Sequence, residues 1–149
     1  MEREYNHLPR GYRNNNPLNI VRNNIKWKGM SNAQTDARFC VFKEMKYGFR
    51  AAIIILCRSY YIRKWWTIRQ IISHWAPSNE NNTEAYIEKV CVYTGISADS
   101  ILPQPNKENR RVLVRLITAM AIVENGYWDE DYKGDLILGM SMVFDPDSL

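Results

Sequence analysis

The chain has 149 residues, of which 46% are hydrophobic and 24% charged, and this length and composition suit one globular domain with a real core. Its net charge of +4 allows attraction to a polyanion without requiring one. Three cysteines with neither CxxC nor metal-ligand spacing argue against a disulfide framework and indicate reduced thiols. The polar first residues do not resemble a signal peptide, and no apolar run is long enough to span a membrane. We therefore expect synthesis in the cytoplasm and delivery by another machine to any target outside it.

The first part of the chain is polar and rich in Arg and Asn, and residues 1–12 are predicted to form a flexible arm. Asn16 and Asn19 are candidate binding residues, because an amide offers both a donor and an acceptor to a polar ligand such as a sugar. Short segments rich in β-formers follow at 18–21, 25–28 and 38–42, with turn residues between them. They predict a small antiparallel hairpin or sheet, in which Trp27 is a core residue, a substrate platform or both.

The rest of the chain has helical periodicity. Apolar residues recur at three- and four-residue spacing, which predicts helices over 47–61, 68–75, 84–93 and from Asn106 to a stop at Gly126. Thr67 is the predicted N-cap of the second helix, and Gly95 ends the third. Residues 128–149 are predicted to pack as a short helix or an extended C-terminal strap. The predicted fold class is α+β and mainly α, in a single domain over 1–149 with a small sheet near its start.

Glu124 is the principal candidate for chemistry. It lies in the last turn of the most apolar predicted helix, where the helix dipole disfavours a negative charge. Burial and the dipole both raise a carboxyl pKa, and a carboxyl that is protonated near neutral pH is what a general acid for glycoside cleavage requires. The alternative is a Glu at the rim of the core whose carboxylate reaches water. Spacing alone does not decide between them.

Other constellations carry weaker signals. His7 and His74 are far apart and lack paired ligands, so neither a metal nor a cofactor is expected. Tyr86 is predicted on the core side of its helix, as an ordinary core Tyr or a residue of the site. A basic and aromatic cluster suggests nucleic-acid binding but is more typical of a solvated helix end, so a nucleic-acid partner is not favoured. This cluster consists of Arg58, Arg63, Lys64, Trp65, Trp66 and Arg69.

Several motifs together resemble a group of phage and prophage proteins described as virion structural proteins or endolysins. The most specific is Arg-Gly-x-Arg-Asn-Asn-Asn-Pro at residues 10–17, and the resemblance extends over about residues 10–126. The other motifs are Trp-Lys-Gly at 27–29, Arg-Phe-Cys-Val-Phe at 38–42, Gly-Phe-Arg-Ala at 48–51, Trp-Ala-Pro at 75–77, Glu-Asn-Asn-Thr at 80–83, Tyr86 and Val-Glu-Asn-Gly at 123–126.

A more distant similarity is to bacterial β-N-acetylglucosaminidases and lytic transglycosylases of the lysozyme superfamily. The strand, Trp, Phe and Tyr elements of those enzymes recur here in order, but their Glu-x-Gly helix comes last, as Glu124 to Gly126, instead of first. The order is that of a circular permutation, which is feasible because domain termini often lie close together. The resemblance implies a lysozyme-like domain in which Glu124 is the catalytic acid and Tyr86 an active-site Tyr.

The resemblance implies cleavage of peptidoglycan glycan strands, at the wall or periplasm after release, or from a virion-associated position. A hydrolase needs a second carboxylate, for which the candidates are Glu44, Asp36 and Glu80 in that order, whereas a lytic transglycosylase needs none. Predicted substrate contacts are Tyr86, Asn16, Asn19, Trp27 and Glu80. Two alternatives remain open: a non-catalytic virion or baseplate protein that retains the fold, and a nucleic-acid-binding module.

Overall fold

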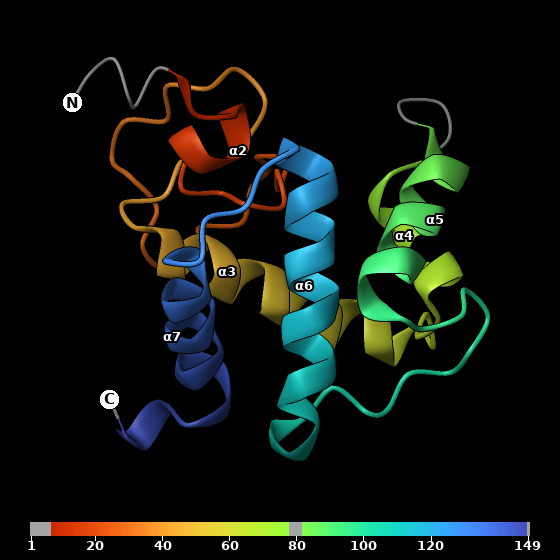
Figure 1. Cartoon of the computed structure of the whole chain (residues 1–149). Helices are drawn as coiled ribbons and strands as arrows, with labels where there is room; N and C mark the ends of the chain where they lie inside the picture. Colours follow the sequence, from red (N-terminus) through yellow and green to blue (C-terminus); the bar gives the residue numbers. More distant parts are fainter. Residues whose placement is uncertain (1–6, 78–81, 149) are drawn as a thin grey trace.

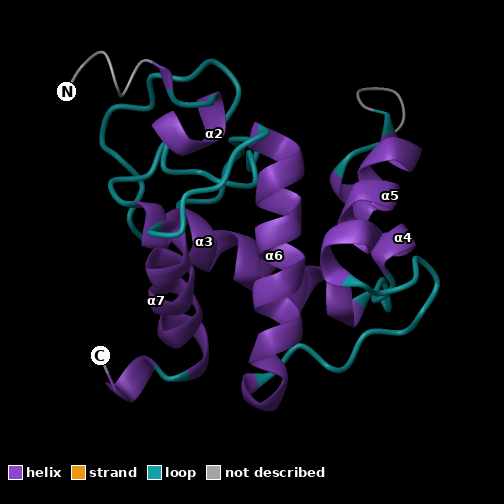
Figure 2. Cartoon of the chain, in the orientation of Figure 1, coloured by secondary structure: helices purple, strands orange, loops and turns teal. Residues whose placement is uncertain are grey.

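The computed structural model describes residues 7–77 and 82–148 of the chain. In that part the chain consists of helices and the loops between them (Figure 2). The α-helices are α2 (Arg10–Arg13), α3 (Met45–Ile54), α4 (Ile68–Trp75), α5 (Thr83–Thr94), α6 (Arg110–Asn125) and α7 (Tyr132–Phe144). Shorter helical segments are η1 (Ile55–Tyr60), η2 (Lys107–Asn109) and η3 (Pro146–Ser148).

The predicted antiparallel hairpin is wrong, and with it the α+β class. The described residues contain no strand, and the segments expected to pair form only isolated bridges, Val21–Phe39 and Met30–Phe42, with a few backbone hydrogen bonds around them. Side chains add to this sparse backbone pairing. The buried Asn16 amide donates to the carbonyls of Ile20 and Cys40, both at 3.0 Å. The β-formers there are core residues of a loop that polar side chains fix, and the mainly helical part of the prediction holds.

The Asp36 carboxylate also holds this loop in place through hydrogen bonds. Asp36 accepts two hydrogen bonds of 2.7 Å from the Arg10 guanidinium and one of 2.9 Å from the Asn14 amide. It also accepts the backbone N–H groups of Arg38 and Phe39, each at 2.8 Å. The Arg10 guanidinium holds the pKa of Asp36 far below its usual range, although partial burial opposes that shift. Residues 10–42 are therefore ordered by side chain–backbone hydrogen bonds.

The four predicted helices are confirmed in their approximate positions, whereas the prediction of a flexible arm over residues 1–12 is wrong for Arg10 to Tyr12, which lie in α2 with Tyr12 buried. Helix α4 spans the predicted residues, and the Thr67 hydroxyl accepts the Gln70 N–H at 3.1 Å as its N-cap. Gly95 and Gly126 end α5 and α6 with positive φ angles of 72° and 69°. The first long helix differs, because its second half, η1, is a π-helix. Hydrophobic periodicity does not reveal a π-helix, since its apolar residues still fall on a buried side.

Helix α6 stands in the middle of the molecule (Figure 1). It contacts α5 on one side and α2 and α7 on the other, while α3 passes behind it in this view. Its buried face carries Leu113, Leu116, Ile117 and Met120, which are at most 1% exposed. Full burial of each such side chain is worth roughly 1.5–3 kcal/mol relative to exposure. This burial fixes the last turn of α6, where Glu124 lies.

The contact between α3 and α7 depends on one glycine. A Cβ atom on Gly139 of α7 would lie 2.7 Å from the Lys46 carbonyl oxygen and 2.9 Å from the Arg50 nitrogen, both backbone atoms of α3. The two helices can pack this closely only because position 139 has no side chain. Gly134, on the same helix, would place a Cβ with no atom within 4 Å.

These two glycines give a matched test of the packing. We expect Gly139→Ala to lower the free energy of unfolding by about 1–3 kcal/mol, because α3 and α7 must separate to admit the methyl group. Gly134→Ala should instead leave stability unchanged or raise it by up to about 1 kcal/mol, since Ala has the higher helix propensity. Urea unfolding of both variants measures the difference, and equal stabilities would contradict the close α3–α7 contact.

Candidate active site

The site is built around the carboxyl group of Glu124 in the last turn of α6. The Asn19 amide donates to Glu124 Oε1 at 2.9 Å, and the Tyr86 hydroxyl donates to Glu124 Oε2 at 2.9 Å. Asn19 lies in the loop after α2 and Tyr86 lies on α5, so the carboxyl joins three elements that are distant in sequence. The sequence predicted each of these residues as part of a site, and the structure brings the three together.

The electrostatic environment of Glu124 differs from that of an ordinary ion pair. Burial raises the pKa of the Glu124 carboxyl, and the hydrogen bonds from Asn19 and Tyr86 oppose this shift without reversing it. No positive charge contributes to the shift, and Arg10, a possible salt-bridge partner, is engaged by Asp36. The pKa of Tyr86 is raised well above its usual value, first by burial and then by Glu124, so its hydroxyl stays protonated.

The backbone holds Asn19 in a sparsely populated conformation. Its φ angle is 52°, in the left-handed region that Asn tolerates better than most residues. The neighbours on both sides are fixed: the Trp75 indole donates to the Leu18 carbonyl at 3.2 Å, and the Asn16 side chain accepts the Ile20 N–H at 2.9 Å. Such strain costs about 1–3 kcal/mol and clusters at functional sites. The amide of Asn19 thus reaches Glu124 from a backbone conformation that is anchored on both sides.

Gly11 of α2 lies against the side chains of Asn19 and Asn125, where there is no room for a Cβ atom. A Cβ on Gly11 would lie 3.0 Å from Asn19 Oδ1 and 2.4 Å from Asn125 Oδ1. Both amide oxygens are buried and accept no hydrogen bond from the described residues. Their amide nitrogens are engaged, with Asn19 bonded to Glu124 and Asn125 donating to the carbonyl of Pro17 at 2.8 Å. Helix α2 therefore packs against the end of α6 through a residue without a side chain.

Aromatic residues border the site on the side of α4 and η1. Tyr60 and Trp75 have ring centroids 5.8 Å apart, and both are half-buried. Tyr60 is close enough to Tyr86 to raise its pKa, and Trp75 bonds the residue before Asn19. Sequence reasoning did not place Tyr60 or Trp75 in the site. The Trp-Ala-Pro motif that ends α4 could have indicated Trp75. No sequence feature indicated Tyr60, because its direction depends on the π-helix.

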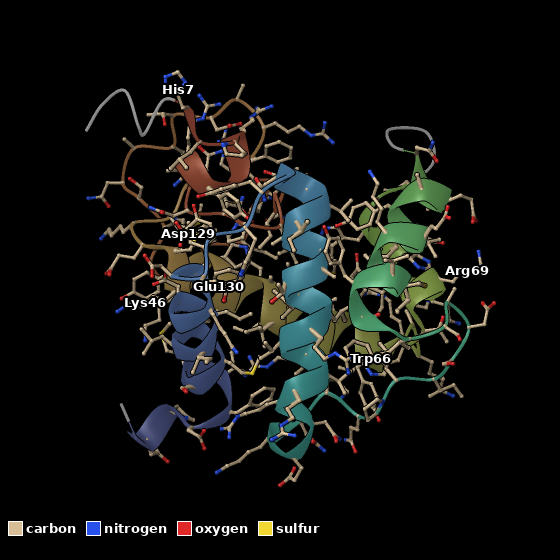
Figure 3. All side chains as sticks on the ribbon, viewed as in Figure 1. His7, Lys46, Trp66, Arg69, Asp129 and Glu130 are labelled. Atoms are coloured by element: carbon tan, nitrogen blue, oxygen red, sulfur yellow. The ribbon has the colours of Figure 1, made fainter. Side chains whose placement is uncertain are left out.

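Other predicted substrate contacts lie elsewhere. Asn16 is fully buried and bonded to the loop backbone, and Trp27 is half-buried, with an indole N–H that has no partner among the described residues. Glu44 lies at the surface 3.9 Å from Lys46, and the pKa of Asp135 on α7 is raised by burial and then by the charge of Glu44. Lys46 lies on the α7 side of the molecule (Figure 3). No hydrogen bond links Glu44 to Glu124 in the part of the chain described here, and Glu80 is outside the described residues.

The basic and aromatic cluster is largely engaged within the protein. The Trp65 ring stacks on His74 with centroids 3.5 Å apart, and the buried Trp66 donates its indole N–H to the Pro103 carbonyl. Arg69 pairs with Asp99 at 2.8 Å and with Glu84 at 3.1 Å. Figure 3 places Trp66 and Arg69 on the side of the molecule opposite Lys46. The indole faces that would stack on bases are therefore not free.

The described residues were also compared with the requirements of a metal site and of a membrane-spanning helix. They contain no group of three or more His, Cys, Asp or Glu side chains placed to hold a metal ion. Among them, no helix combines the length and the apolar character that crossing a bilayer demands.

Comparison with known proteins gives the class first: the chain belongs to a family of phage proteins. It is 38% identical over 139 residues to Protein P5 of Pseudoalteromonas phage PM2, an alignment that covers 88% of this chain and 82% of Protein P5. No family model matches the chain. The phage part of the sequence resemblance is thereby confirmed, whereas no relationship to the lysozyme superfamily emerges from the comparison.

The raised pKa of Glu124 has a measurable effect on stability. Because the folded pKa exceeds the unfolded one, ionisation of this carboxyl destabilises the fold as pH rises through these values, and the penalty is absent below the unfolded pKa. Glu124→Gln removes this penalty. We expect the stability of the Gln variant relative to the wild type to increase as pH rises above the unfolded carboxyl pKa of about 4.3, measured by urea unfolding.

Tyr86→Phe provides the control for that measurement. It removes a hydrogen bond to the carboxylate, so in the wild-type background it should cost about 1.5–3 kcal/mol at a pH where Glu124 is ionised and less at a pH where the carboxyl is protonated. In the Glu124→Gln background its cost should not depend on pH. A Tyr86→Phe cost that stays constant with pH in the wild-type background would show that the carboxyl is not the group responsible.

Proposed function

We propose that this phage protein cleaves the glycan strands of peptidoglycan, with Glu124 as general acid. The observation that carries the proposal is a partly buried carboxyl whose pKa is raised and whose hydrogen-bond partners among the described residues are two neutral donors. The half-buried rings of Tyr60 and Trp75 lie next to those partners, Tyr60 near Tyr86 and Trp75 bonded to the residue before Asn19. A general acid must hold its proton near the working pH and release it to the leaving oxygen. Desolvation without a neighbouring cation raises the pKa of Glu124 and so favours the protonated form that this role needs.

Asp36 supports this assignment by contrast. Both carboxyls are partly buried and accept hydrogen bonds, but Asp36 pairs with Arg10 while no cation shifts Glu124. The fold therefore moves their pKa values in opposite directions. Carboxyls whose environments separate their pKa values mark the division between structural and acid–base roles. Asp36 has the features of a structural residue, and Glu124 those of an acid.

The surroundings also suit a sugar polymer. Tyr60 and Trp75 offer apolar ring surface beside polar groups, which is the combination that binds the faces and hydroxyls of sugar rings. The net charge of +4 favours approach to the anionic cell wall. The phage family provides a biological setting, since a phage must pass the wall on entry or release. The protein would act there after delivery.

A single carboxylate is sufficient for the lytic transglycosylase route. Glu124 donates its proton to the glycosidic oxygen as the bond from that oxygen to the anomeric carbon breaks. The 6-hydroxyl of the same sugar then attacks the anomeric carbon and returns its proton to the Glu124 carboxylate, so that an anhydro sugar forms and the enzyme is restored. We favour this route over hydrolysis because Glu44 lies beside Lys46 and Asp135, and because Asp36 is held by Arg10.

The test is the activity of Glu124→Gln on purified cell walls. The amide keeps the size of the side chain but cannot donate a proton to the leaving oxygen, so clearing of wall suspensions should slow by at least ~100-fold. Glu88→Gln, an exposed change on α5, is the matched control and should clear at the wild-type rate. Mass spectrometry of the products should find anhydro ends, whereas reducing ends would indicate hydrolysis. A Glu124→Gln variant as active as the control would end the assignment.

The second candidate is a phage structural protein without enzymatic activity. It is favoured by the fact that both oxygens of Glu124 already have protein donors, as in a purely structural network. In that case the wild-type protein would not clear cell walls from any bacterial host tested, including a host of phage PM2. The Glu124→Gln variant would then differ from the wild type only in stability.

A further inference from the structure

A second candidate site lies at the opposite end of α6 from Glu124. Arg110, Arg111, Val114 and Arg115 on the first half of α6, together with residues of α7, line a cavity of about 550 Å³. Since an α-helix rises 1.5 Å per residue, Arg111 and Glu124 are separated by roughly 20 Å along the helix axis. The cavity is therefore independent of the carboxyl site, and nothing in the proposed glycan cleavage uses it.

The rim of this cavity is positively charged. Arg111 on α6 and Lys133 on α7 are exposed, and no described residue pairs with either. Two further guanidinium groups are held by the protein itself. Arg110 forms an ion pair with Asp145, and Arg115 donates to the Thr94 carbonyl. Asp145 also pairs with Lys107 at 2.7 Å, so two cations share the one carboxylate that lines the cavity. The balance of charge at the rim is cationic.

The floor of the cavity is apolar. Val114 of α6 and Ile137 and Met140 of α7 contribute to its lining, and Ile137 is 48% exposed. This large aliphatic side chain, which lies between cationic residues, therefore exposes apolar surface to solvent. The volume falls within the range of roughly 300–1,000 Å³ that small-molecule sites occupy, and such sites combine apolar walls with a few convergent polar groups. The exposed cations and the apolar floor together specify a ligand with an anionic head and an apolar body.

We propose that this cavity binds an anionic amphiphile, with its phosphate or carboxylate head between Arg111 and Lys133 and its hydrocarbon chain over Ile137. Charge-assisted hydrogen bonds from the guanidinium and ammonium groups hold the head. Burial of the chain against Val114, Ile137 and Met140 strengthens binding with each methylene group that leaves water. A two-fold pairing of this face with itself does not suit the site, because the same cations would then face one another.

The experiment is calorimetric titration of the full-length protein with octyl phosphate below its micelle concentration. We expect saturable binding that is much tighter than binding of octyl glucoside, which has the same chain and a neutral head. It should also be much tighter than binding of inorganic phosphate, which has no chain. Equal affinity for octyl phosphate and either of these comparison ligands, or no binding of octyl phosphate, would overturn the proposal.

Variants locate the binding. The double variant Arg111→Gln/Lys133→Gln should weaken octyl phosphate binding by about tenfold or more, because it removes both cations that face the head. The double variant Lys26→Gln/Arg58→Gln makes the same change in net charge at exposed positions outside the cavity and should bind as the wild type does. Ile137→Asn should weaken octyl phosphate without affecting inorganic phosphate. Equal affinities of the two double variants would contradict a site between α6 and α7.

The source of the amphiphile is decided with lipid vesicles. Vesicles of phosphatidylcholine with added phosphatidylglycerol present the same chemistry in a bilayer, and phosphatidylcholine alone is the neutral comparison. Sedimentation with the anionic vesicles that is lost in Arg111→Gln/Lys133→Gln would identify a membrane lipid as the ligand. Binding of octyl phosphate without sedimentation would identify a free amphiphile. Sedimentation that is equal for both double variants would mean that another surface binds lipid, against the proposal.

Discussion

One partly buried carboxyl, bonded by neutral donors, connects three parts of this fold. The Glu124 oxygens accept one hydrogen bond from the N-terminal loop and one from α5, while the helix that carries them runs through the middle of the molecule. An apolar residue at position 124 would leave the Asn19 and Tyr86 donors unsatisfied, and a cation there would accept neither bond. The fold therefore requires an acceptor at this position, and a desolvated carboxyl is the form it takes.

The need of buried polar groups for partners also explains the N-terminal loop. Between α2 and α3 backbone pairing is limited to isolated bridges and a few hydrogen bonds, so the remaining buried N–H and C=O groups need partners from side chains. Asn16 and Asp36 provide several of them, and Arg10 neutralises the charge that Asp36 brings. The loop can then present Asn19 in a strained conformation, because the residues on both sides of it are anchored. Order in this region comes from a few polar residues.

The elements that could be predicted from the sequence are those set by residues close together in the chain. The cap at Thr67 and the stops at Gly95 and Gly126 depend on the chemistry of single residues, and they lie where the pattern placed them. The hairpin prediction was wrong because alternation of apolar residues does not reveal how far backbone pairing extends, and here it stops at isolated bridges between which the Asn16 side chain also bonds the backbone. Glu124 was found because a carboxylate at an apolar helix end is conspicuous. The aromatic border of the site was missed because it depends on how distant helices meet.

The π-helical segment η1 sets the direction in which Tyr60 emerges from its helix. A π-helical ring contains one residue more than an α-helical ring, and each α-helical residue turns the chain by about 100°. The segment therefore rotates the side chains that follow it about the helix axis. The apolar face of α3 still packs on α7, while Tyr60 points toward Trp75 and not in the direction that a continuous α-helix would give it. Sequences that align with this one but lack a residue between 55 and 60 would keep the packing of α3 and lose the aromatic border of the site.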